Sequence, residues 1–179
     1  MTGAEQRRLQ QMSDPRKPKP LDDAVLHGAH VLIVDARYHE AIADELVAGA
    51  AEFLKAAQVN IERASVPGAL EIPVAAAIEL ENARRAGRTI DGIVALGCVI
   101  RGETAHFDIV AHESARALIA LGVERHMPVG NGILTVDSEA QAIERASRKS
   151  GNKGGAAAEA ALVLIRIART TAEKRQPWR

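Results

Sequence analysis

The chain has 179 residues, with 23 basic and 23 acidic side chains, so its formal net charge is zero. This length suits one domain with a substantial hydrophobic core. The balanced charge and an aromatic content of 2% argue against a nucleic-acid partner. A single cysteine, Cys98, excludes an internal disulfide, and no charged-then-apolar leader or long apolar run predicts export or a membrane span. We therefore expect a soluble, cytoplasmic protein with neither a nucleic-acid nor a membrane partner.

The first twenty residues, MTGAEQRRLQQMSDPRKPKP, are polar and basic, with prolines near their end. We expect a flexible tail over residues 1–20 and a single domain over residues 21–179. The basic side chains of the tail could bind an acidic partner, but a solvated tail is the simpler interpretation. After the tail, the short apolar piece AVLHG, residues 24–28, predicts an edge strand.

Apolar runs and amphipathic segments alternate along the rest of the chain. The runs predict strands over residues 30–34, 59–66, 93–100 and 127–136. Apolar side chains at three- to four-residue spacing predict helices over residues 41–57, 74–86, 107–121 and 155–171, with a further helix capped by Asp137 or Ser138. This order predicts an α/β fold: a three-layer αβα, flavodoxin-like, doubly wound arrangement around a four-stranded parallel sheet with an N-terminal edge strand. Ligands bind beyond the carboxyl ends of the strands in such sheets.

The apolar run over residues 93–100 passes directly into the polar sequence RGETAH. A turn at Gly102 and a hydroxyl cap at Thr104 should leave the amides of Gly102, Glu103 and Thr104 free at a helix start, which attracts anions. His106 follows, and its ordinary pKa near ~6.5 lets it transfer protons at neutral pH. A helix cap or a surface position is the alternative interpretation of this histidine.

Two other segments carry unusual residue patterns. In VPGALEIP, residues 66–73, Pro67 and Gly68 predict a tight turn, and Glu71 suits a helix start, where it could simply be a cap. In AIERASRKSGNKGG, several basic side chains lie close together, and glycines allow the backbone to bend. Its basic residues are Arg145, Arg148, Lys149 and Lys153. A solvated face is the alternative interpretation of that cluster.

A metal site and a nucleophilic thiol are both rejected. His112 and Glu113 could join His106 around a metal, but a six-residue step turns a helix by about 600°, roughly 240° net, so the imidazoles diverge. Cys98 lies inside the apolar run over residues 93–100, where we expect an inert buried thiol.

The motifs ARYH, VPGALEIP, GCVIRGETAHFD and AIERA with GNKG resemble, in this order, the signature of the lumazine synthases. The resemblance covers about residues 31–164. It implies condensation of 5-amino-6-(D-ribitylamino)uracil with 3,4-dihydroxy-2-butanone 4-phosphate to 6,7-dimethyl-8-ribityllumazine, phosphate and water, a step of riboflavin biosynthesis. It implies no metal and no organic cofactor.

The resemblance also assigns roles to residues. The implied catalytic residues are His106, Arg145 and Lys153, where the histidine moves protons and the two cations bind phosphate. The implied substrate-binding residues are Tyr38, Gly68, Ala69, Leu70, Glu71, Cys98, Val99, Ile100, Gly102, Glu103, Thr104 and Asn131. Two of them depart from the family pattern. Glu103 places a carboxylate beside the phosphate, so its side chain must turn away, and Asn131 stands where the family often has phenylalanine.

The resemblance further implies a ring of five subunits, in which a neighbour lends Asn131, Arg145 and Lys153 and receives the N-terminal strand. A pentamer, a pair of pentamers and a sixty-subunit shell all stay open, and riboflavin synthase is an implied partner. A non-catalytic flavin- or ribityl-binding protein, or a cage scaffold, is the alternative on the same fold. His106 together with two phosphate-binding cations favours the enzyme.

Overall fold

The structure, a computed structural model, describes residue 21 and residues 23–170; the predicted tail over residues 1–20 lies outside them. The strands are β1 (His30–Ala36), β2 (Asn60–Val66), β3 (Gly92–Ile100) and β4 (Val129–Val136). The helices are α2 (Glu40–Ala56), α3 (Glu71–Arg85), α4 (His106–Arg125), α5 (Glu139–Ala146) and α6 (Lys153–Arg169). The predicted alternation of strands and helices is confirmed.

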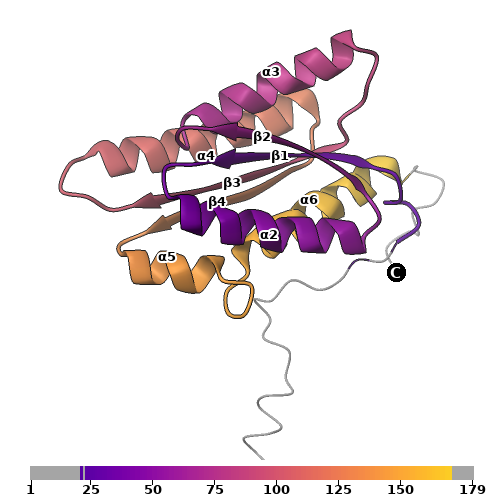
Figure 1. The fold of residues 1–179 in the computed structure, drawn as a ribbon. Coiled ribbons are helices and arrows are strands. Elements are labelled where there is room, and N and C mark those ends of the chain that lie inside the picture. The colour runs from indigo at the N-terminus through magenta and orange to yellow at the C-terminus, as the bar shows by residue number, and fades with distance from the viewer. Residues whose placement is uncertain (1–20, 22, 171–179) are drawn as a thin grey trace, which may run out of the picture.

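The four strands form one parallel sheet in the order β2-β1-β3-β4. Helices α3 and α4 cover one face of the sheet, and α2, α5 and α6 cover the other (Figure 1). The predicted three-layer, doubly wound fold is therefore confirmed. The chain crosses from β2 past β1 to β3, so the helices after β1 and β3 lie on opposite faces. That reversal opens a crevice at the carboxyl ends of the strands.

Two hydrophobic cores, one on each face, explain the sequence pattern of the strands. Strand β3 lies between β1 and β4 and is covered on both faces, so nearly all of it is buried. A strand in that position needs the unbroken apolar run that the sequence has. Strand β4 is an edge strand, and its exposed positions, Asn131 and Thr135, alternate with buried ones.

Helices α2 and α6 pack unusually closely against each other and the sheet. A Cβ atom at Gly154 would overlap the backbone of Leu46 on α2, and one at Gly130 would overlap the backbone of Ala157 on α6. These glycines therefore permit close approach between elements. The prediction that the glycines of this segment allow the backbone to bend is thus incomplete. The bend itself comes from Asn152, which has a left-handed φ of 40° and accepts a hydrogen bond from the Gly155 amide.

The edge strand predicted over residues 24–28 is not formed. The chain makes successive turns there, in which the Leu26 amide donates to the Asp23 carbonyl at 2.8 Å and Gly28 has a left-handed φ of 71°. Leu26 is completely buried, and Arg169 donates a hydrogen bond to the Val25 carbonyl at 3.0 Å. Burial of Leu26 against the domain, rather than strand pairing, holds this segment.

Helix boundaries differ slightly from the predicted ones. Helix α3 begins at Glu71 and α4 continues to Arg125, beyond their predicted limits. Of the two caps proposed for α5, Ser138 is the N-cap, and its hydroxyl accepts from the Gln141 amide. Among the residues that the structure describes, no helix is both long enough and apolar enough to cross a membrane.

Candidate active site

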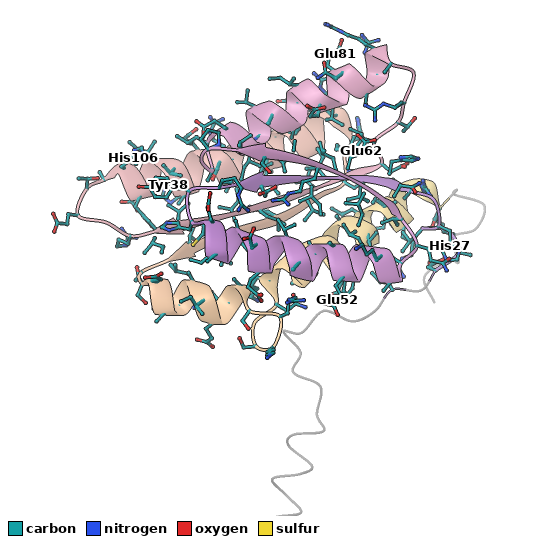
Figure 2. All side chains as sticks on the ribbon, in the orientation of Figure 1. His27, Tyr38, Glu52, Glu62, Glu81 and His106 are labelled. Carbon is teal, nitrogen blue, oxygen red and sulfur yellow. The ribbon has the colours of Figure 1, made fainter. Side chains whose placement is uncertain are left out.

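A cavity of about 390 Å³ lies at the carboxyl ends of β1, β2 and β3. It is lined by Tyr38, His39, Gly68, Ala69, Leu70, Glu71, Cys98, Val99, Ile100, Gly102, Thr104, His106, Phe107 and Val110. The crevice predicted from the strand order therefore collects most of the candidate site residues. Figure 2 shows Tyr38 and His106 at the same end of the sheet. We name this the strand-end cavity.

The loop between β1 and α2 carries Tyr38, whose side chain is 79% exposed. Its ring meets the His39 ring edge-on, with 5.0 Å between the centroids. A broad aromatic face thus stands beside the cavity, where it can stack on a flat heterocycle.

The loop between β2 and α3 forms the tight turn that the sequence predicts. The Glu71 amide donates to the Gly68 carbonyl at 3.3 Å, and the Ile72 amide donates to the Ala69 carbonyl at 3.4 Å. The Glu71 carboxylate folds back over Gly68, because a Cβ there would lie 2.9 Å from Oε2. This carboxylate lines the cavity and is placed to accept hydrogen bonds from ligand hydroxyl groups.

Cys98 lines the cavity from β3 but remains only 9% exposed. Burial raises the pKa of its thiol to about 11. The thiol therefore stays protonated at neutral pH, as expected for an inert buried cysteine.

The turn between β3 and α4 differs in one detail from its prediction. Thr104 Oγ1 accepts from the His106 amide at 3.4 Å, but the N-cap of α4 is Ala105, which has no side-chain cap. The amides of Gly102, Glu103 and Thr104 donate no hydrogen bond within the described part of the chain. They remain available to an anion at the start of a long helix. Glu103 itself does not line the cavity, in contrast to Gly102 and Thr104.

Arg101 holds this turn in place, a role that the sequence analysis missed. Its guanidinium lies 4.0 Å from the ring centroid of Phe107 and pairs with Asp108 at 3.4 Å and Asp137 at 3.1 Å. These contacts join the turn to α4 and to the end of β4. The sequence signal was a lone arginine directly after a buried strand.

Arg145, Lys153 and Asn131 lie elsewhere. They line a second cavity of about 370 Å³ beside the edge strand β4, together with residues of α6. Arg145 Nη1 donates to the Gln141 carbonyl at 3.3 Å, and Asn131 Oδ1 accepts from the Ile133 amide at 3.0 Å. The strand-end cavity and this edge cavity share no lining residue. One chain therefore does not bring the two predicted phosphate-binding cations to His106.

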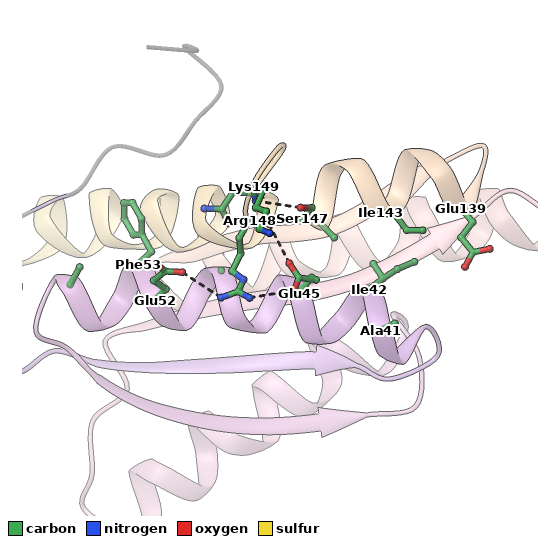
Figure 3. Close-up of a pocket in the computed structure, with 14 residues that line it drawn as sticks. Ala41, Ile42, Glu45, Glu52, Phe53, Glu139, Ile143, Ser147, Arg148 and Lys149 are labelled. Atoms are coloured by element: carbon green, nitrogen blue, oxygen red, sulfur yellow. Dashed lines mark hydrogen bonds and ion pairs between the residues drawn. The ribbon is translucent and has the colours of Figure 1, made fainter. Parts of the chain in front are cut away.

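A cavity of about 940 Å³ lies between α2 and α5 with the segment that joins α5 to α6 (Figure 3). Arg148 crosses it, and its guanidinium pairs with Glu45 at 3.5 Å and Glu52 at 3.8 Å. The Arg148 amide and guanidinium lower the pKa of Glu45. This cavity contains none of the predicted site residues, and Arg148 is engaged in ion pairs there.

A buried ionic cluster at the end of β1 is the main feature that the sequence analysis did not identify. Asp35 is fully buried, and its carboxylate accepts from Arg63 at 2.7 and 2.8 Å, from Ser65 at 3.0 Å and from Arg37 at 3.4 Å. Burial by itself raises the pKa of this carboxyl, but the bonds from Arg63 and Ser65 lower it overall. The only sequence signal was an aspartate ending the apolar run HVLIVD.

The described residues hold no group of three or more histidine, cysteine, aspartate or glutamate side chains that could bind a metal ion. The chemistry assembled in the strand-end cavity consists of an aromatic face, a carboxylate, a set of free amides and two imidazoles, those of His39 and His106. These groups can bind, orient and protonate an organic ligand.

Fold and site together define a doubly wound α/β protein with a cavity of small-ligand size beyond the carboxyl ends of its strands. The family model described as 6,7-dimethyl-8-ribityllumazine synthase matches residues 28–169. The chain belongs to this family.

Several relatives that have the same name match this chain over most of their length. The chain is 62% identical to 6,7-dimethyl-8-ribityllumazine synthase of Xanthobacter autotrophicus, over 82% of this chain and 89% of that protein. It is 58% identical to the protein of Methylobacterium radiotolerans, over 85% and 89%, and 59% identical to that of Azorhizobium caulinodans, over 79% and 88%. The family suggested by the sequence motifs is therefore confirmed.

Proposed function

We propose that the chain is an active 6,7-dimethyl-8-ribityllumazine synthase, which condenses 5-amino-6-(D-ribitylamino)uracil with 3,4-dihydroxy-2-butanone 4-phosphate and releases phosphate and water. One observation carries this proposal. A chain of this family gathers Tyr38, the turn at Gly68 to Glu71 and the turn at Gly102 to His106 around a single cavity.

In this mechanism the uracil stacks on Tyr38, and main-chain groups of Gly68 and Ala69 face the pyrimidine. The Glu71 carboxylate accepts hydrogen bonds from the ribityl hydroxyls. Holding the amine against the ketone supplies most of the rate, since orientation of two reactants can contribute up to ~7 to 11 kcal/mol. A cavity formed by three short turns on a rigid sheet suits that task.

His106 transfers protons during imine formation and phosphate loss, a contribution of about 100-fold or more. The amides of Gly102, Glu103 and Thr104 hold the phosphate at the start of α4. His106 is the first residue of that helix, so its proton-transferring imidazole lies next to the anion-binding turn.

We further propose that a neighbouring subunit completes the site with Arg145, Lys153 and Asn131. The separation of the two cavities within one chain supports this, because either cavity by itself has only part of the groups. Exposed apolar side chains on α4, Ile119 and Val123, border a further groove beside β4 and supply surface for such a contact. A head-to-tail contact of this kind closes into a ring, here of five subunits, which a pair of rings or a shell can extend.

We propose a cytoplasmic location, and riboflavin synthase, which consumes the lumazine, as the protein partner. Neither metal nor organic cofactor enters this mechanism, since the proton transfers and the phosphate binding use side chains and amides of the chain.

Incubation of the purified protein with both substrates tests the proposed function. Absorbance of the lumazine product should rise only when both substrates and the protein are present. Failure to form product by a protein that nevertheless binds the ribityl ligand would favour the non-catalytic alternative.

A further inference from the structure

The loop that presents Tyr38 has little support of its own. Between the end of β1 at Ala36 and the start of α2 at Glu40 lie only three residues. The Tyr38 ring is largely exposed, and the one ring contact it makes within the described chain is with the neighbouring His39. The His39 carbonyl accepts from the Ala43 amide of α2 at 2.9 Å, which fixes one side of the tyrosine. The other side of the tyrosine depends on Arg37.

Arg37 ties this loop to two other elements. Its Nη1 donates to Asp44 Oδ1 on α2 at 2.8 Å and to Asp35 Oδ2 on β1 at 3.4 Å. Its backbone amide donates to the Val66 carbonyl at the end of β2 at 2.8 Å. The Arg37 side chain is 27% exposed, and hydrogen bonding to Asp44 and Asp35 raises its pKa. The residue before Tyr38 is thus fixed at both its backbone and its side chain.

One of the two carboxylates that Arg37 binds, that of Asp35, is itself held by several hydrogen bonds. Asp35 is fully buried, receives two bonds from Arg63 and one from Ser65, and lies opposite Ser65 in the register of β1 and β2. Ser65 and Val66 immediately precede the Pro67–Gly68 turn. Both loops that form the proposed pyrimidine side of the strand-end cavity therefore start from one ionic cluster.

We propose that Arg37 is a positioning residue for the pyrimidine substrate, because it holds the Tyr38 loop in its binding geometry before the ligand arrives. This inference rests on the proposed function. The bound geometry is then already present in the free protein, so binding does not have to order the loop. Arg37 itself does not line the cavity and reaches no reacting atom.

Steady-state kinetics of Arg37→Gln test the proposal. The KM for the ribitylaminouracil should rise about threefold to tenfold, the cost of ordering one or two side chains on binding. The kcat and the KM for the phosphate-bearing ketone should stay unchanged. An unchanged uracil KM, or an equal rise for both substrates, would overturn the proposal.

Two further variants complete this test, one as a matched control and one as a second change at the same ion pair. Arg84→Gln makes the same chemical change at an exposed ion pair with Glu81 on α3 and should leave both KM values unchanged. Asp44→Ala removes the acceptor of the shorter Arg37 bond at a side chain that is 65% exposed, so it should fold even if Arg37→Gln does not. It should shift the uracil KM in the same direction by a smaller factor, and no shift would contradict the proposal.

A spectroscopic readout is independent of turnover. Tyr38 is the only tyrosine of the chain, so incorporation of 3-fluorotyrosine gives one ¹⁹F signal from this ring. In Arg37→Gln, but not in Arg84→Gln, the signal of the ligand-free protein should move or broaden. A signal identical to that of the wild type would overturn the proposal. If the wild type forms no lumazine, the proposed function fails, while the ¹⁹F comparison still decides whether Arg37 positions Tyr38.

Discussion

His106 combines exposure with position at the first residue of α4, so its side chain contributes little to packing. Substitution by alanine should therefore leave the fold intact and remove a proton-transferring group. We expect His106→Ala to lower turnover by a factor of roughly tens to hundreds. Assays of lumazine formation at saturating substrate measure this effect.

His112→Ala is a matched control for that experiment, because it removes an exposed imidazole from the same helix outside the strand-end cavity. Its turnover should equal that of the wild type. If His106→Ala and His112→Ala were equally active, His106 would have no part in the mechanism.

Arg145 and Arg148 lie three residues apart but have different surroundings. The Arg145 side chain lines the edge cavity, whereas Arg148 pairs with Glu45 and Glu52. We expect Arg145→Ala to weaken the binding of the phosphate-bearing ketone by about 1.5 to 3 kcal/mol, the contribution of a charge-assisted hydrogen bond. The KM for the uracil should not change.

Arg148→Ala is the comparison for this measurement, since it removes the same charge from the same segment. It should lower the free energy of unfolding without a selective effect on the ketone. If Arg145→Ala weakened the binding of both substrates equally, the assignment of Arg145 to phosphate binding would be contradicted.

Among the elements, strands β1 and β2 are joined by the side-chain bonds of Asp35 to Arg63 and Ser65 as well as by their backbone pairing. The Asp35 pKa is lowered in the fold, so the stabilisation by this carboxylate is present above its ordinary value of 3.8 and is lost as the pH falls below that value. Asp35→Asn should cost about 1.5 to 3 kcal/mol at pH 7, because it removes the buried charge that binds the half-exposed Arg63.

Urea unfolding of the wild type and Asp35→Asn at a series of pH values measures this dependence. The difference between the two proteins should shrink as the pH falls below 3.8. A difference that stayed constant from neutral to acid pH would show that charge at Asp35 is not its source.

Helix α6 depends on a glycine for its approach to α2. A Cβ at Gly154 would overlap the Leu46 backbone, and backbone cannot move as easily as a flexible side chain. We expect Gly154→Ala to destabilise the fold by roughly 1 to 3 kcal/mol, despite the better helix propensity of alanine. Thermal or urea unfolding measures the change.

Gly102→Ala is the control, since a Cβ at that position meets no atom within 4 Å. Its free energy of unfolding should be unchanged or slightly higher. An unaltered stability of Gly154→Ala would mean that the two helices can separate without cost.

At the scale of the whole molecule, the strand-end and edge cavities of one chain hold complementary halves of the proposed site. We therefore expect an assembly whose mass is about five times 19.1 kDa, or a higher multiple of that ring. Light scattering on the purified protein measures the mass directly. A mass near 19.1 kDa in an active preparation would refute the shared site, and the multiple observed separates a ring from a shell.

The sequence by itself determined the four strands and five helices of the sheet layers, their order and the end of the sheet where the strand-end cavity lies. These depend on local patterns: apolar runs predict buried strands, and three- to four-residue spacing predicts helices. The parallel sheet then places the turns after β1, β2 and β3 at one edge. Tyr38, Glu71 and His106 could be assigned to one cavity for this reason, although they are far apart in the chain.

Only the tertiary structure decided which side chains hold those turns and which cations remain available. Asp35 bonds to Arg63, 28 residues away, and Arg148 bonds to Glu45, 103 residues away. The same holds for residues 24–28, which have an apolar pattern suited to a strand but turn because Leu26 is buried against the domain. No local periodicity encodes such pairs, because they arise when packed elements bring distant residues together.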